Sequence, residues 1–111
     1  MSDRALIIKK RWLDLILEGK KTWEIRGSDT KIRGMIGLIE SGSGLIVGEC
    51  ELVTSCPVFD GDALLECLHG ISDWSDIKYK NPHAWVLKNT KRYEKPKPYN
   101  HPQGAVIWVK I

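Results

Sequence analysis

The chain has 111 residues, of which 42% are hydrophobic and 28% charged, and its net charge is +3. These values are typical of one soluble globular domain, long enough to bury a core without disulfides or a structural metal. No apolar run approaches the length of a membrane span, and the first residues lack the pattern of a signal peptide, so we expect a cytoplasmic protein. Three cysteines with no C-x-x-C pair indicate neither a disulfide framework nor a zinc site, and we expect no metal and no cofactor.

The order of predicted elements indicates a mixed α+β domain. An apolar strand is expected at residues 5–9, followed by a helix whose apolar face carries residues 12, 13, 16 and 17 and which Gly19 ends in a left-handed conformation. Further strands are expected at residues 22–26, 35–40, 45–53, 84–87 and 105–109, with Gly48 as a bulge. A second helix is expected over residues 60–70, and Pro96, Pro98 and Pro102 predict a long connection that cannot pair in the interior of a sheet. Periodicity alone indicates an α+β domain that is mostly strand. The order of the helices and strands suggests a small sheet curled into a barrel, with two helices over its openings.

Negative charge is concentrated in one segment of the chain. Residues 58–77 contain five acids and no lysine or arginine, so the rest of the chain carries about +8. A basic surface favours a polyanionic partner such as nucleic acid or a nucleotide, and ordinary solubilising charge is the alternative.

The strand at residues 22–26 is unusual because it contains opposite charges. Thr22, Glu24 and Arg26 point to one side of an extended strand, while Trp23 and Ile25 point to the other, which has the character of a core face. Lys21 precedes the strand and is able to lean over the polar side. The sequence therefore predicts a cluster of Lys21, Glu24 and Arg26.

Three interpretations of this cluster remain open. In a recognition pocket, Lys21 and Arg26 bind a phosphate or a base edge and Glu24 orients them. In a metal-free hydrolase, Glu24 acts as general base on water and Lys21 stabilises an oxyanion. In the third, Glu24 and Arg26 form a structural ion pair in the mouth of the barrel.

Aromatic residues support the recognition interpretation. Trp12, Trp23 and Trp108 lie in apolar contexts and are expected in the core. The other tryptophans and the tyrosines are interleaved with lysines and arginines, a pattern that fits a surface for single-stranded nucleic acid; they are Trp74, Tyr79, Trp85, Tyr93 and Tyr99. The alternative is that these residues hold a long loop in place by packing.

The segment RWLDLILEGKKTWEIRG resembles the signature of ASCH domains, a branch of the PUA-like β-barrel superfamily. The distinctive pattern G-x-K-x-x-E-x-R is matched by Gly19, Lys21, Glu24 and Arg26, and the closing HPQGAVIWVKI is similar to the last strand of small bacterial members. The resemblance covers nearly the whole chain, most weakly at residues 56–79. It implies a single PUA-like domain over residues 1–111, with about five to six strands and two covering helices.

The resemblance also implies alternative activities. Some small bacterial ASCH proteins are N4-acetylcytidine amidohydrolases that use a lysine, a threonine and a glutamate. Here Lys21 matches the lysine, Glu24 stands at the threonine position, and Glu66, Asp73 or Asp76 would supply the later acid. Other ASCH proteins resemble RNA-binding or ribonuclease modules, although no pair among His69, His83 and His101 indicates acid–base cleavage of RNA.

Our sequence-based hypothesis is an ASCH-type domain that binds RNA or a nucleotide in a cleft. Lys21, Glu24 and Arg26 would form its floor, and Tyr93, Tyr99 and the turn at residues 101–104, including Gln103, would form one wall. If the protein is an enzyme, Lys21 and Glu24 are the expected catalytic residues of an amidohydrolase or ribonuclease. A third hypothesis is a protein-interaction domain whose acidic helix at residues 60–66 faces a partner.

Overall fold

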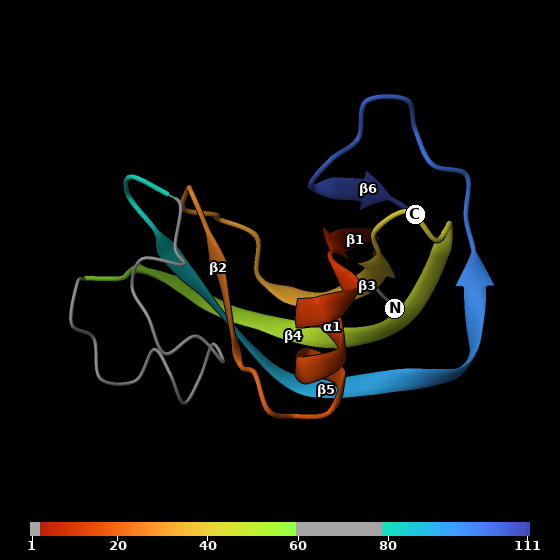
Figure 1. Ribbon diagram of the computed structural model, residues 1–111, viewed down its shortest axis with the longest axis horizontal. Helices are drawn as coiled ribbons and strands as arrows, with labels where there is room; N and C mark the ends of the chain where they lie inside the picture. The colour runs from red at the N-terminus through yellow and green to blue at the C-terminus, as the bar shows by residue number, and fades with distance from the viewer. Residues whose placement is uncertain (1–2, 60–78) are drawn as a thin grey trace.

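The computed structural model describes residues 3–59 and 79–111, which form one α-helix and six β-strands (Figure 1). The elements are β1 (Arg4–Ile8), α1 (Lys10–Leu17), β2 (Trp23–Arg26), β3 (Gly34–Glu40), β4 (Leu45–Pro57), β5 (His83–Pro98) and β6 (Trp108–Lys110). The predicted second helix lies at residues 60–70, outside the described residues. In the described part of the chain, no helix is long and apolar enough to cross a bilayer.

All six strands belong to one sheet, in the order β2-β5-β4-β3-β1-β6. The β1–β3 pair is parallel and the other pairs are antiparallel. The sheet curls, so that β2 and β6, which are its two edges, lie on the same side of the molecule as α1 (Figure 1). The prediction of a curled, barrel-like sheet is confirmed.

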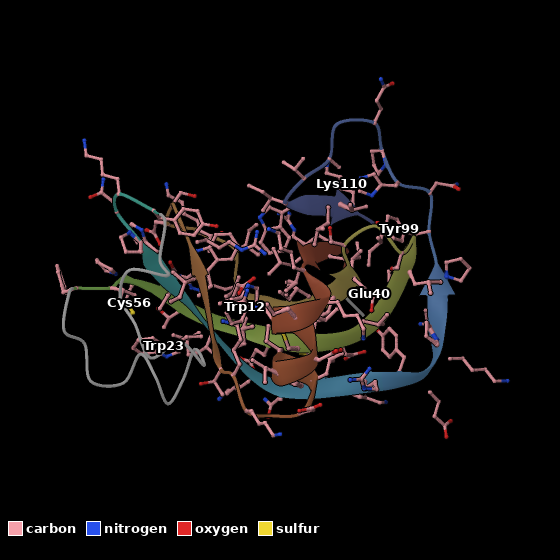
Figure 2. All side chains as sticks on the ribbon, in the orientation of Figure 1. Trp12, Trp23, Glu40, Cys56, Tyr99 and Lys110 are labelled. Atoms are coloured by element: carbon pink, nitrogen blue, oxygen red, sulfur yellow. The ribbon has the colours of Figure 1, made fainter. Side chains whose placement is uncertain are left out.

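The inner face of the curled sheet forms the main core under α1. Alternate residues of the strands point inward, among them Leu6, Ile8, Leu38 and Leu52, and they pack against Leu13 and Ile16 of the helix. Trp12 packs against this core from α1, whereas Trp23 packs in a separate cluster with Ile25, Val58 and Ala84. Figure 2 accordingly shows Trp12 between α1 and β2, and Trp23 on the opposite side of β2.

A second cluster covers the opposite face of the sheet. It is formed by alternate residues of β1, β3, β4 and β6, and Tyr93, Tyr99 and Ala105 pack against it from the end of β5 and the following loop; its buried members are Ala5, Ile7, Ile39, Ile46 and Val109. The sheet is therefore buried on both faces where β5 wraps around it, which explains the continuous apolar run of β1.

Strand β5 is much longer than the predicted strand at residues 84–87. The expectation that Pro96 and Pro98 lie in a connection was wrong, since both belong to β5 and Pro98 pairs with Leu45 of β4. The prolines are tolerated because β2 pairs with β5 only through residues 83–86. Beyond that point β5 has a free edge among the described residues, where a missing N–H costs no ladder bond.

Strand β6 is shorter than the predicted strand at residues 105–109. Both backbone groups of Ala105 are used by the preceding turn: its N–H donates to Pro102 and its carbonyl accepts from the ring of His101. Val106 and Ile107 are 74% and 41% exposed, so the apolar composition of this run does not reflect burial.

Candidate functional site at the Lys21–Glu24–Arg26 cluster

The end of helix α1 sets the position of Lys21. Gly19 is left-handed, with φ of 79°, and its N–H donates to the Ile16 carbonyl over 3.1 Å, while that of Lys20 donates to Leu15 over 2.9 Å. These two bonds form a Schellman motif, which reverses the chain after a helix. The N–H of Lys21 also donates to the Leu15 carbonyl, over 3.1 Å, so the lysine is fixed against the helix end before β2 begins.

Glu24 lies between two cations. Its side chain is 5% exposed, and its Oε1 is 3.4 Å from Nζ of Lys21. Its Oε2 accepts hydrogen bonds from Nε and Nη2 of Arg26, over 3.2 and 2.8 Å. With both cations charged, the cluster carries one net positive charge.

Lys21 is the most deeply buried member of the cluster. Its side chain has no exposed surface, and Nζ donates to the Trp23 carbonyl over 2.6 Å and lies 5.1 Å from the centre of the Trp12 ring. Burial lowers the pKa of Lys21 from 10.5 to about 8, although the Glu24 carboxylate acts in the opposite direction. Lys21 can therefore lose its proton close to neutral pH.

Arg26 connects the edge strand β2 to β1, the strand next to the other edge of the curled sheet. From β2, its Nη2 donates to the carbonyl of Ile7 in β1 over 2.8 Å, and its guanidinium carbon lies 5.7 Å from the centre of the Trp85 ring. Trp85 stacks on Trp108 of β6, with ring centres 5.8 Å apart. Arg26 keeps 16% of its side chain exposed, and no described residue accepts a hydrogen bond from its Nη1.

The structure thus brings Lys21, Glu24 and Arg26 together, with the predicted alternation along β2. It places the other three predicted site residues elsewhere. Tyr93 and Tyr99 pack in the second cluster, on the opposite face of the sheet, and Gln103 is exposed in the turn between β5 and β6. The hydroxyl of Tyr93 donates to Glu49 over 2.9 Å.

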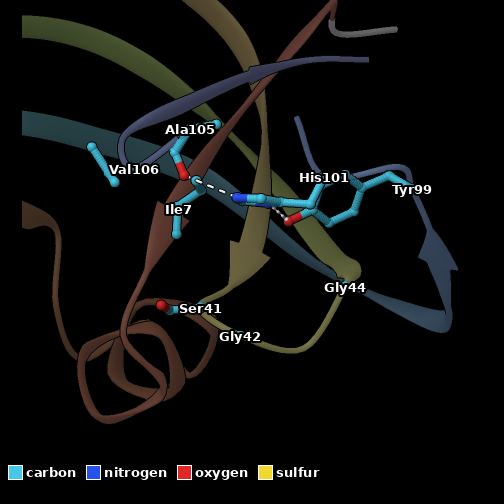
Figure 3. Close-up of a pocket in the computed structure, with 8 residues that line it drawn as sticks. All are labelled: Ile7, Ser41, Gly42, Gly44, Tyr99, His101, Ala105 and Val106. Atoms are coloured by element: carbon cyan, nitrogen blue, oxygen red, sulfur yellow. Dashed lines mark hydrogen bonds between the residues drawn. The ribbon is translucent and has the colours of Figure 1, made fainter. Parts of the chain in front are cut away.

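Two residues of the predicted wall, Tyr99 and His101, line a different pocket, of about 250 Å³, between the β3–β4 turn and the loop after β5 (Figure 3). Nε2 of His101 donates to the Ala105 carbonyl over 2.9 Å, which leaves Nδ1 to accept from the Tyr99 hydroxyl over 2.7 Å (Figure 3). The side chain of Ile7 also lines this pocket. Its carbonyl binds Arg26, so the pocket and the cluster lie on different sides of β1.

The lysine-rich part of β5 is exposed but partly neutralised. Lys88 and Lys91 stand opposite Glu51 and Glu49 of β4. The ammonium of Lys97 lies 4.9 Å from the centre of the Tyr93 ring. The tyrosine rings of this segment therefore pack on the sheet or on its own lysines, whereas Trp85, from the start of β5, meets the cluster at Arg26.

Sequence reasoning missed the aromatic side of the cluster. It assigned Trp12 and Trp108 to the core, and both pack against the core, but each is half-buried and also borders the cluster: Trp12 lies beside Lys21, and Trp108 stacks on Trp85 beside Arg26. The chain reversal at Gly19 could have indicated Trp12, because it folds Lys21 back onto the helix. Trp85 was predicted as part of the aromatic and basic surface, but its position beside Arg26 depends on strand pairing, which no local signal indicates.

The described residues offer little for a metal or a thiol nucleophile. They contain no group of three His, Cys, Asp or Glu side chains placed to hold a metal ion. Cys50 is fully buried, and burial raises the pKa of its thiol to about 12, which keeps it protonated. The acids Glu66, Asp73 and Asp76, and also His69 and Trp74, lie outside the described residues.

Comparisons with known proteins bear on the fold and the family of the chain. The crystal structure of ASCH from Zymomonas mobilis superposes with a TM-score of 0.72 at 13% identity, covering 97% of this chain and 86% of that chain. Crystal structures of two mutant forms of that protein give TM-scores of 0.69 and 0.68 at 14% identity, covering 97% and 100% of this chain and 88% and 91% of theirs. These likenesses show the fold, and a search of curated proteins finds no match. The family model for the ASCH domain matches residues 6–97, most of the chain, and the protein therefore belongs to the ASCH domain family.

Proposed function

We propose that this ASCH domain binds RNA or a nucleotide at the Lys21–Glu24–Arg26 cluster. The observation that carries the proposal is the arrangement of two cations around one carboxylate, with Nη1 of Arg26 unpartnered among the described residues and part of its side chain exposed. A guanidinium whose Nε and Nη2 are held by Glu24 and Ile7 keeps its Nη1 donors for an incoming phosphate or base.

The surroundings of the cluster support an anionic, flat ligand. The guanidinium of Arg11 lies 4.2 Å from the centre of the Trp12 ring, and Lys21 lies near the same ring. Positive charge and a half-buried aromatic ring thus continue from the cluster onto α1. Proteins that bind single-stranded nucleic acids combine these two elements.

Fluorescence anisotropy of a short labelled single-stranded RNA tests the proposal. We expect salt-dependent binding that weakens at least about ten-fold in Arg26→Ala, because a charge-assisted hydrogen bond is lost. Arg26→Lys retains the charge but not the fork geometry and should give an intermediate loss. Arg33→Ala is the matched control, since it removes the same charge from an exposed side chain that bonds its own loop carbonyls. Equal losses in Arg26→Ala and Arg33→Ala, with both variants folded, would disprove binding at the cluster.

A second candidate function is hydrolysis of a modified nucleoside such as N4-acetylcytidine, and the lowered pKa of Lys21 favours it. A lysine that titrates near neutral pH is typical of catalytic sites. Acetate release from N4-acetylcytidine should then occur in the wild type and vanish in Lys21→Met. Absence of turnover by the wild type at high enzyme concentration would eliminate this candidate. Ribonuclease activity is a separate question and is assayed by gel electrophoresis.

A further inference from the structure

His83 lies on the same face of the sheet as the cluster. In the β2–β5 pair, Arg26 stands directly opposite His83 and Glu24 stands opposite Trp85. Residues directly opposite each other in antiparallel strands point to the same face, with their Cβ atoms about 5 Å apart. His83 is therefore a cross-strand neighbour of Arg26, although the two residues are far apart in the sequence.

The hydrogen bonds of His83 define what its ring can do. Nδ1 lies 3.0 Å from the carbonyl oxygen of Asn81. A carbonyl can only accept, so Nδ1 carries the proton, and in the neutral ring Nε2 keeps its lone pair. No described residue hydrogen-bonds Nε2, and the side chain is half-buried. In its neutral form His83 thus presents an acceptor on the same face of the sheet as Arg26, from the residue directly opposite it.

This pairing of an acceptor with a cation matches one feature of RNA. Each ribonucleotide carries a 2′-hydroxyl, which donates a hydrogen bond, beside its 3′-phosphate, which needs a cation or donor. DNA keeps the phosphate and lacks the hydroxyl. A free nucleobase offers neither group.

We propose that His83 accepts the 2′-hydroxyl of a ribonucleotide whose phosphate lies on Arg26, and that this contact makes the site select RNA over DNA. The inference rests on the proposed function, because it assigns the ligand class of the same site. His83 is a specificity-determining residue in this arrangement and takes part in no bond-making step.

Anisotropy titrations with two labelled strands of identical base sequence, one of RNA and one of deoxyuridine-containing DNA, test this assignment. The wild type should prefer RNA by about five-fold, the value expected for one hydrogen bond to a neutral group. His83→Ala should bind both strands with the affinity that the wild type has for DNA. His83→Gln retains an acceptor oxygen and should recover part of the preference. The matched control is His101→Ala, since His101 is exposed and bonds Tyr99 and Ala105 away from the cluster.

The outcomes separate this inference from the proposed function. Equal affinity of the wild type for both strands, or an RNA preference that survives in folded His83→Ala, overturns the inference while RNA binding itself stands. Failure of the wild type to bind either strand overturns the proposed function and the inference together. Cleavage of the RNA during the titration, seen on a gel and absent in His83→Ala, also overturns the inference, because His83 would then act in catalysis.

Discussion

At the scale of single residues, Lys21 has the most unusual environment in the described part of the chain. A lysine side chain without exposed surface has lost its hydration, and one carboxylate at 3.4 Å restores part of that free energy. The lowered pKa of Lys21 measures the part of the lost hydration free energy that the carboxylate does not restore. Such a lysine reduces the stability of the fold at neutral pH, which makes a purely structural role for the ion pair a poor explanation of its presence.

The pKa of Lys21 leads to a prediction about stability. In the unfolded chain Lys21 has its ordinary pKa of 10.5 and in the fold about 8, so between these values the unfolded state binds more protons. The free energy of unfolding contributed by Lys21 therefore rises with pH across this window, by up to about 3 kcal/mol. Urea denaturation of the wild type and Lys21→Met at several pH values from 7 to 10.5 measures this difference.

The matched control for this measurement is Lys20→Met. Lys20 is exposed and its ion pair with Glu18 lies at the surface, so its substitution should leave the pH profile parallel to that of the wild type. A profile of Lys21→Met that also runs parallel to the wild type would show that Lys21 titrates normally in the fold.

At the scale of elements, local signals predicted β1, α1, β2, β3 and the connection at residues 41–44, because each is defined by a short apolar or periodic run or by glycines. The bulge at Gly48 was also predicted, and the strand register shifts there. The length of β5 could not be predicted in this way. Its second half is exposed, lysine-rich and contains prolines, and it is a strand because β4 continues beside it.

The same reasoning explains what could be predicted of the cluster. Lys21, Glu24 and Arg26 lie within six residues, so alternation along one strand was enough to group them. Trp85, Trp108 and His83 join them through cross-strand register and the curling of the sheet, and no local pattern encodes either property.

Gly48 provides a prediction at this scale. Between the pairs Ile46–Lys97 and Gly48–Arg92 the register shifts, and a Cβ at Gly48 would lie 2.5 Å from the Lys91 carbonyl oxygen and 2.9 Å from Leu17 Cδ2. Because a backbone atom cannot move aside alone, Gly48→Ala should lower the free energy of unfolding by about 2 kcal/mol in urea denaturation. Gly27→Ala is the control. Its Cβ would meet the Tyr79 ring at 2.7 Å, and that half-exposed ring can swing away, so the loss should be clearly smaller. Equal losses would contradict this account.

At the scale of the whole molecule, the curled sheet has a seam between its two edges, β2 and β6. The described contacts across the seam come from side chains of the edge strands and their neighbours: Arg26 of β2 binds the Ile7 carbonyl of β1, and Trp85 of β5 stacks on Trp108 of β6. The proposed binding site is therefore built into the closure of the fold. A ligand that engages Arg26 would act on the same contacts that hold the edges together.

Trp108→Ala tests the importance of this closure. Loss of the stacked ring should lower the free energy of unfolding by about 3 kcal/mol, the low end for a tryptophan because Trp108 is half-buried. Amide hydrogen exchange should show the additional local effect. The amide of Ile7, which donates to the Ile107 carbonyl, should lose more protection than amides in the centre of β3.

Trp23→Ala is the control for this experiment, since Trp23 packs on the far side of β2 in a cluster with Ile25, Val58 and Ala84. It should destabilise the fold without selective loss of protection at Ile7. If Trp108→Ala lowers protection equally at Ile7 and in β3, the Trp85–Trp108 stack contributes to global stability and does not close the seam. A selective loss at Ile7 that RNA binding reverses would link the closure of the sheet to the ligand, because a ligand bound on Arg26 and His83 stabilises the closed form in proportion to its affinity for it.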